Sequence, residues 1–397
     1  MGSPLAEFKE AASNHLKLDR DDAMVVDFMM AVSACNFLRE RGEMLWGHII
    51  GAPGSVKTEI LRTLNGHAKT YFLSSLTAHS IISGYETPDG SDPSQLPKWN
   101  DHVVVVKEFT TILQLPDAAK QEIFSTLRSC YDGFHAKAFG TKGLVSHKSH
   151  FSMVTAVTPA IDRYTLLHAD LGERFLAYRV DRYDGMDEAK RDEMNRHVWD
   201  VSDNKSVWRA ILCEKAHAVL HHLMKLRGSK NKSDNRRLDV AAFTTDQHDQ
   251  IIELAELLVR IRTVPDFDDT NPQPKMPEKA YRAIQQFKRL ACGRCIADDR
   301  TEINDTDLQL VRRVAGDTMA PPLYNFMQYM YQDAKKTRLL VHRNPIKIAK
   351  RLGYPLEYVV KLAKQYVYSK LLHQEDGNIR LTKNAYDMLN HSKMLST

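Results

Sequence analysis

The sequence lacks the features that would tie the chain to a membrane or to a disulfide framework. No apolar run approaches the length that crosses a bilayer, and the leading residues have neither the basic nor the apolar region of a secretory signal. Five cysteines are scattered along 397 residues: Cys35, Cys130, Cys213, Cys292 and Cys295. Because an odd, dispersed set favours reduced thiols, we expect a cytoplasmic protein without membrane partners.

Metal-like spacing is also scarce, and neither sign of charge is in large excess. Cys292-Gly-Arg-Cys295 has the spacing of half a zinc site, but no second pair lies nearby and its segment has a helical pattern. We therefore expect neither zinc nor redox chemistry there. The net charge of +5 permits nucleic-acid binding without indicating it. Cations gather between Lys335 and Lys370, where a solvated helical face would look similar.

A phosphate-binding loop is present, but it lacks one glycine. The stretch from Gly51 to Thr58 follows G-x-x-x-x-G-K-[ST], except that Val56 occupies the second glycine position. In such loops, backbone N–H groups face the phosphates of ATP, the lysine adds positive charge and the hydroxyl reaches Mg²⁺. The residues that we assign to nucleotide contact are Gly51, Pro53, Gly54, Ser55, Val56, Lys57, Thr58 and Glu59. The alternative is a Gly/Pro turn beside an incidental Lys-Thr pair.

The surrounding pattern predicts an α/β fold. Between residues 45 and 183, apolar runs typical of strands alternate with helical patterns, which favours a parallel sheet covered by helices. The predicted strands are Leu45–Ile50, Tyr71–Leu73, His102–Val106, His150–Val157 and Phe175–Val180. Helical patterns in 1–44 and 184–332 predict an N-terminal helical segment and an all-α lid. Residues 333–397 have the order helix, helix, hairpin, which predicts a winged helix.

A strand that ends in a carboxylate is needed beside such a loop, to hold Mg²⁺ and to activate water. His102-Val-Val-Val-Val-Lys107-Glu108 is the candidate, and we assign Glu108 to both tasks with Thr58 as the second metal ligand. Lys107 stands where an acid is usual and would repel the metal ion. Because side chains alternate along a strand, Lys107 can turn away from Glu108. The alternative is a buried strand that ends in an incidental charged pair.

Two further residues follow the later strands. Thr158 ends a strand before a proline, where a polar side chain can sense the γ-phosphate and orient water. Arg174, followed by Arg179, lies where ring-forming ATPases place the finger that enters a neighbour's site. We therefore assign catalytic roles to Thr158 and Arg174.

Taken in order, these motifs resemble the AAA+ ATPases, and most of all the minichromosome-maintenance replicative helicases and their relatives on phages and integrated elements. Their loops read G-D-P-x-x-[AS]-K-S, to which residues 51–58 are similar. Lys107-Glu-Phe stands in place of D-E-F, Thr155-Ala-Val-Thr-Pro resembles A-A-N-P, and Glu173-Arg-Phe resembles S-R-F. The segment from Arg282 to Arg289 resembles the lid helix of the family. The similarity covers roughly residues 40–320, without the family's N-terminal domain.

The resemblance implies further roles. Arg282 corresponds to the second sensor arginine, which adds it to the catalytic set. The stretch from Asp132 to Gly143 corresponds to a hairpin whose lysine tracks single-stranded DNA in a central channel, and Lys137 and then Lys142 are the candidates. A surface hairpin with solvated lysines is the alternative.

The winged domain offers a second set of DNA candidates. Lys361 and Lys364 on its second helix and Arg380 on its wing could touch duplex backbone. Winged domains are also used purely for protein interaction, so that reading stays open. A DNA-bound protein would be found at the nucleoid.

Two functions are compatible with this pattern. The first is a DNA-dependent ATPase that forms a ring, by resemblance a hexamer, and acts as a replicative helicase or translocase of a mobile genetic element with replication partner proteins. The second is an ATP-dependent assembly switch or helicase loader that hydrolyses little. Val56 and Lys107 depart from an efficient hydrolytic site and favour the second.

Overall fold

The structure is a computed structural model that describes residues 2–18, 22–39, 44–85, 87–140, 142–167, 174–180, 196, 204–228, 238–239, 241–264 and 274–395. The chain forms two compact units, which are described separately. The first comprises Met1–Ala242 with Lys288–Leu310, and the second comprises Phe243–Phe287 with Val311–Thr397. The four segments expected from the sequence stay predictions.

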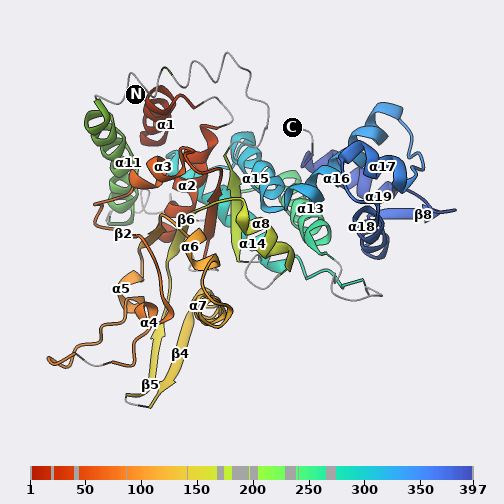
Figure 1. The fold of residues 1–397 in the computed structure, drawn as a ribbon. Coiled ribbons are helices and arrows are strands. Elements are labelled where there is room, and N and C mark those ends of the chain that lie inside the picture. Colours follow the sequence, from red (N-terminus) through yellow and green to blue (C-terminus); the bar gives the residue numbers. More distant parts are fainter. Residues whose placement is uncertain are drawn as a thin grey trace. The chain divides into compact units, whose positions relative to one another are not determined.

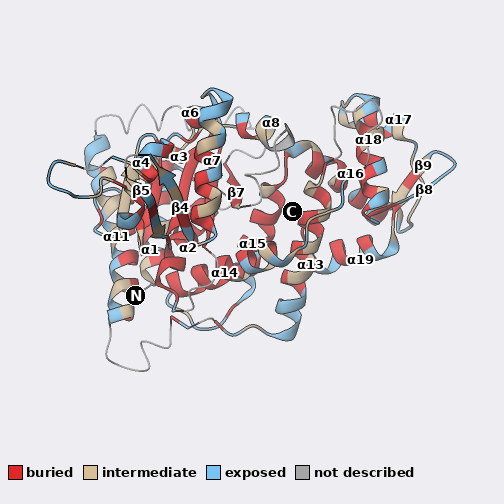
Figure 2. Cartoon of the chain, turned by 90° about the horizontal axis from the view of Figure 1, so that it is seen from below, coloured by how far each residue is buried: buried red, intermediate tan, exposed pale blue. Residues whose placement is uncertain are grey.

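The first unit is built on a parallel five-stranded sheet, which confirms the α/β core (Figure 1). Its strands are β1 (Trp46–Ile50), β2 (Thr70–Leu73), β3 (Val103–Val106), β6 (Ser152–Val157) and β7 (Phe175–Arg179). Each matches a predicted strand, with ends that differ by one or two residues. Strands β1, β3, β6 and β7 are buried throughout, whereas the edge strand β2 is half-buried. Buried residues are drawn in red in Figure 2. Burial on both faces is typical of parallel sheets and explains the run of valines in β3.

The strand order defines where a ligand is expected to bind. The order is β2-β3-β6-β1-β7, so the connection that leaves β1 runs to the β2 side of the sheet. The connection that leaves β6 runs the opposite way, past β1 to β7. In open α/β sheets, ligands bind at the carboxyl ends of two neighbouring strands whose connections run in opposite directions along the sheet. Strands β1 and β6 meet that condition.

Helices α1 (Pro4–Leu16) and α2 (Met24–Ala34) precede the sheet, and a 3-10 turn, Cys35–Phe37, continues α2. Nearly every residue of α2 is buried, because it packs against β1 and β6 and also against α1. The packing against β1 requires Gly47, since a Cβ there would lie 2.5 Å from the Phe28 ring. Gly293 of α14 (Tyr281–Ala297) likewise lets that helix approach α2, since a Cβ there would lie 2.2 Å from the Ala31 carbonyl oxygen.

The remaining helices of this unit follow the strands. They are α3 (Lys57–Arg62), α4 (Ala78–Ile81), α5 (Leu96–Trp99), α6 (Thr110–Leu113), α7 (Asp117–Tyr131), α8 (Ala160–Leu167) and α11 (Lys205–Gly228). Between α7 and β6, strands β4 (Phe134–Phe139) and β5 (Gly143–Lys148) form an antiparallel hairpin that extends away from the sheet (Figure 1). The hairpin expected from the sequence is therefore present. Phe134 and Leu144 on it are exposed.

A buried ion network joins α2 to α14 (Tyr281–Ala297) and α15 (Asp305–Thr318). The Arg294 guanidinium is 2.9 Å from Asp307 and 3.4 Å from Asp27, and Arg300 is 2.6 Å from Asp307. Asp27 also pairs with Lys9 of α1. Because each buried carboxylate faces at least one cation, the desolvation of these charges is compensated within the first unit.

The second unit is mainly helical. It contains α13 (Thr245–Arg262), the first residues of α14, the end of α15, α16 (Pro321–Thr337), α17 (Pro345–Leu352), α18 (Leu356–Tyr368) and α19 (Lys383–Ser392). Strands β8 (Leu372–Glu375) and β9 (Asn378–Leu381) form a hairpin through Asp376 and Gly377, both of which have positive φ. Arg343 pairs with Ile379 as a short third strand. The order helix, helix, hairpin after residue 344 is as expected.

None of the helices in the described ranges combines the length and the apolar character that crossing a membrane requires.

His48 introduces a titratable group into the middle of the sheet. Its side chain is buried, its Nδ1 lies 2.6 Å from Thr155 Oγ1, and its ring stacks on Phe175. Burial disfavours the charged imidazolium and lowers the pKa of His48 from 6.5 to about 3. The folded state therefore holds a neutral histidine under conditions where the unfolded chain takes up a proton.

We predict that this difference makes the fold acid-sensitive. The stabilising effect of a neutral His48 is complete above pH 6.5 and is lost as the pH falls from 6.5 toward 3, because only the unfolded state binds the proton. Replacing His48 with Gln should make the loss of unfolding free energy between pH 7 and pH 5 smaller by about 2 kcal/mol. Urea unfolding at both pH values measures it. Equal losses in the two proteins would contradict the prediction.

Candidate nucleotide-binding site

The loop of residues 51–56 leaves β1 at the centre of the sheet and leads into α3. Its start is held from both sides, because the Gly51 N–H donates to the Val157 carbonyl (3.2 Å) and the Val180 N–H donates to the Ile50 carbonyl (2.8 Å). Within the loop, the Ser55 N–H donates to the Ala52 carbonyl (3.2 Å). The loop therefore starts at a fixed position between the ends of β6 and β7.

Val56 occupies a position where the backbone does not need glycine. Its φ of −64° and ψ of −5° are right-handed helical values, which any L-residue adopts. The glycine requirements lie elsewhere: Gly54 has φ +85°, and a Cβ on Gly51 would lie 2.9 Å from Ser55 Oγ. The glycine missing from the motif is therefore no defect of the loop's backbone.

Lys57 places its ammonium group inside the loop. Its side chain is buried, and Nζ donates to the carbonyl oxygens of Gly51 (2.6 Å) and Ala52 (2.5 Å) and to Ser55 Oγ (2.8 Å). The next residue, Thr58, is half-buried at the first turn of α3. First-turn N–H groups of a helix have no partner within the helix, so a positive charge and backbone donors occur together here.

Glu59 is tied to a distant helix. Its carboxylate accepts from Arg209 Nε at 2.8 Å and also pairs with the Arg209 Nη2 group. Arg62 of α3 lies 3.7 Å from the same carboxylate. The side chain of Glu59 thus fixes α3 to α11, which leaves its backbone for the nucleotide contact that the sequence suggested.

The ends of β3 and β6 meet at the same edge of the sheet as the loop. The backbone after β3 is anchored on both sides, since the Lys107 N–H donates to Leu73 and the Phe109 N–H donates to Ala156. Lys107 is half-buried and Glu108 is exposed. Ile50 is paired with Val157, and Val106 with Thr155, so Glu108 and Thr158 follow their strands within about one residue of the level of Gly51.

Thr110 connects these two strand ends. Its Oγ1 accepts from the Thr158 N–H at 2.9 Å and lies 3.4 Å from Thr158 Oγ1. Thr158 is therefore held in place by a hydroxyl only two residues beyond Glu108. Thr110 is not among the residues predicted from the sequence, although a hydroxyl so close to a strand-terminal carboxylate is a usable signal.

Arg174 lies at the opposite edge of the sheet. It directly precedes β7, whose Phe175 is paired with Trp46, while Ile50 at the far end is paired with Arg179. From Phe175 to Arg179 there are four residue steps of about 3.3 Å, so the amino end of β7 lies roughly 13 Å from its carboxyl end. The Arg174 guanidinium lies 3.6 Å from Asp132 and over the Tyr131 ring. Leu171–Glu173, which complete the predicted motif, are outside the described residues.

Two other arginines have structural partners. Arg179 forms a two-pronged ion pair with Asp162 of α8, with distances of 2.9 and 2.6 Å, which connects the carboxyl end of β7 to the helix before it. Arg289 donates to the Cys35 carbonyl at 3.1 Å in the first unit. Arg282 belongs to the second unit, and its sensor role stays a prediction.

The hairpin lysines are paired with carboxylates of their own unit. Lys137 Nζ lies 2.6 Å from Glu122 Oε1 and over the Phe139 ring, and Lys142 Nζ lies 3.6 Å from Asp92. The hydrogen bond from Lys137 lowers the pKa of Glu122. Both lysines are partly exposed, so each pair is open to exchange with another anion.

Among the DNA-binding candidates of residues 333–397, Lys364 is exposed. Lys361 pairs with Glu357 one turn earlier at 3.2 Å, and Arg380 Nη1 donates to the Leu381 carbonyl at 3.3 Å. Their contribution to DNA binding stays a prediction.

Two comparisons with known proteins found no match for this chain. No protein-family profile matches it, and no curated protein matches it. The interpretation of the site therefore depends on its own residues and their geometry.

The loop geometry predicts which position tolerates substitution. Gly54→Ala should lower the free energy of unfolding by roughly 1 to 2 kcal/mol, because an L-residue is strained at positive φ. Val56→Ala keeps a right-handed residue in place and is the matched control, so its loss should be smaller. Denaturant unfolding of both variants measures the difference. A larger loss for Val56→Ala would show that the requirement for positive φ is misplaced.

Proposed function

We propose that the protein is an AAA+ ATPase that binds ATP with Mg²⁺ at the carboxyl edge of its sheet and works on DNA as a ring-forming helicase or translocase. The observation that carries the proposal is the meeting of the loop of residues 51–58 with Glu108 and Thr158. All of them lie beyond the carboxyl ends of neighbouring parallel strands, and the connections that leave two of these strands, β1 and β6, run in opposite directions.

The loop residues fit a nucleotide triphosphate. Lys57 already holds its charge among loop oxygens, so phosphate oxygens can replace the Gly51 and Ala52 carbonyls as its partners. Thr58 and Glu108 would hold Mg²⁺, which supplies charge neutralisation at the transferred phosphate. The exposed Glu108 carboxylate accepts a proton from the attacking water, and Thr158, fixed by Thr110, orients that water.

The position of Arg174 supports a ring. An arginine at the amino edge cannot serve the loop of its own chain, so it acts only if a second copy presents its loop to it. Such a contact joins two different surfaces of identical chains, and this kind of interface closes into rings. Asp132 and Tyr131 hold the guanidinium beside α7 until the neighbour arrives.

A DNA role is supported by the extended hairpin. Lys137 and Lys142 are partly exposed and bound by single carboxylates, which DNA phosphates can displace. Binding through phosphates weakens as salt is raised. The winged segment with Lys361, Lys364 and Arg380 provides a second basic surface for duplex DNA or for replication partner proteins.

The alternative is an assembly switch that binds ATP and hydrolyses little. Lys107 favours it, because a half-buried cation beside Glu108 weakens the hold on Mg²⁺. Such a protein would form oligomers with ATP but show negligible turnover, with or without single-stranded DNA. Steady-state ATPase assays alongside sizing therefore distinguish the two functions.

We predict complementation between two inactive variants. Lys57→Ala removes the loop charge, and Arg174→Ala should lower kcat by roughly 10³-fold or more. When the two variants are mixed, the intact loop of one copy faces the intact Arg174 of the other, so DNA-stimulated ATPase should return. Arg260→Ala, which breaks a surface pair with Glu256, is the control and should retain activity. Full activity of Arg174→Ala alone would overturn the ring assignment.

A further inference from the structure

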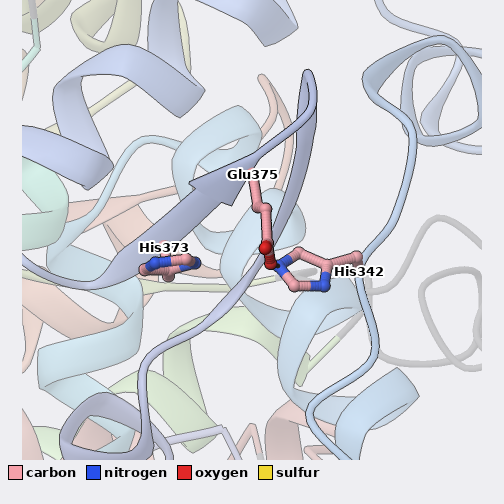
Figure 3. A group of neighbouring side chains, drawn as sticks. All are labelled: His342, His373 and Glu375. Carbon is pink, nitrogen blue, oxygen red and sulfur yellow. Dashed lines mark ion pairs between the residues drawn. The ribbon is translucent and has the colours of Figure 1, made fainter.

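Three side chains with metal-binding atoms gather on the small sheet of the second unit. They are His342, His373 and Glu375, and one ligand atom of each lies within 4.8 Å of the others (Figure 3). His373 and Glu375 are two residues apart on β8, so both project from the same face. The pairing of Arg343 with Ile379, and of His373 with Arg380, brings His342 to that face from the other side of β9.

The imidazole of His342 has an unused nitrogen that faces the carboxylate. Its Nε2 is shielded from solvent and makes no hydrogen bond among the described residues. The nearest carboxylate oxygen, Glu375 Oε2, is 3.5 Å away, which is too far for a good hydrogen bond. The His373 ring centroid lies 5.9 Å from that of His342. A shielded nitrogen that lacks a hydrogen bond, beside an exposed carboxylate and a second imidazole, is arranged for a shared cation.

We propose that His342, His373 and Glu375 bind a divalent transition metal, with zinc as the best match. Zinc takes imidazole nitrogens and carboxylate oxygens at about 2.0 to 2.2 Å in tetrahedral geometry, which places neighbouring ligand atoms roughly 3.3 to 3.6 Å apart. The separation between His342 and Glu375 already has that value. Two nitrogen ligands disfavour Mg²⁺ and Ca²⁺, which prefer oxygen.

The local charges set the strength of the site. Glu375 supplies one negative charge, and Arg380 shares the face, although its guanidinium donates along its own strand to Leu381. On the opposite face, Arg343 is neutralised by Asp333 in a two-pronged pair. With one carboxylate and partial exposure, the fourth ligand is water and the affinity is moderate.

Binding has a structural consequence that is independent of the ATPase proposal. His342 lies in the connection between α16 and α17, whereas His373 and Glu375 belong to β8. A shared ion would link the α16–α17 connection to β8, across β9. This side-chain link would add to the backbone pairing of Arg343 with Ile379 and of β8 with β9. The wing would then be held more firmly to the helices in front of it.

The test is a titration of the full chain with Zn²⁺ and with Co²⁺, whose visible absorption reports nitrogen ligands. His342→Ala, His373→Ala and Glu375→Gln should each weaken metal binding at least tenfold, or remove one equivalent. His391→Ala is the matched control: it is a partly exposed histidine of the same unit whose ring nitrogens already contact Glu253 (2.8 Å) and Asp246 (3.1 Å). It should bind as the parent does, and Mg²⁺ should not compete.

Two results would overturn the proposal. One is an unchanged affinity and stoichiometry in all three variants. The other is an equal loss in His391→Ala, which would indicate nonspecific binding to surface histidines. A change in far-UV circular dichroism of the metal-free variants separates misfolding from loss of a ligand, and Glu375→Gln, an exposed and nearly isosteric change, is the variant least expected to misfold.

Discussion

The candidate site depends on the pairing of β1 along both of its edges. Strands β6 and β7 pair with β1 in parallel and β1 is buried throughout, so its carboxyl end has a fixed position in the sheet. The loop that follows inherits this position, as do Thr158 after β6 and Glu108 after β3. A parallel sheet thus gathers residues more than 100 positions apart at one edge.

Much of this arrangement was predictable from the sequence. Buried parallel strands consist of continuous apolar runs, which is why the four valines of β3 were recognised, and Asp376-Gly377 marks the second hairpin by its need for positive φ. The contacts that complete the site were not predictable. Glu59 and Arg209 are 150 residues apart, and the local sequence around either residue does not predict that the other is its partner. The start of β6 also differs from the prediction, because the Asn100 side chain accepts from the His150 N–H before the strand begins.

Four basic residues of the first unit have partners within their own chain. Lys57, Lys137, Lys142 and Arg174 each contact an oxygen of their own chain. The ion pairs of Lys137 and Lys142 are partly exposed, and such pairs contribute about 0 to 1 kcal/mol, so exchanging one anion for another costs little there. The resting partners keep long side chains in defined places and so reduce the ordering needed on binding. Specificity for phosphate then depends on the number of anionic oxygens offered at once.

Gly47 of β1 and Gly293 of α14 allow both elements to pack closely against the helix α2. Neither residue has a Cβ atom. A Cβ at position 47 would meet Phe28 of α2, and a Cβ at position 293 would meet Ala31 of the same helix. Over evolutionary time, the residues of α2 can exchange one apolar side chain for another of similar volume, but these two positions have no larger substitute. Homologous chains that share this fold should therefore keep glycine at both places even where the loop of residues 51–56 and the β4–β5 and β8–β9 hairpins have diverged.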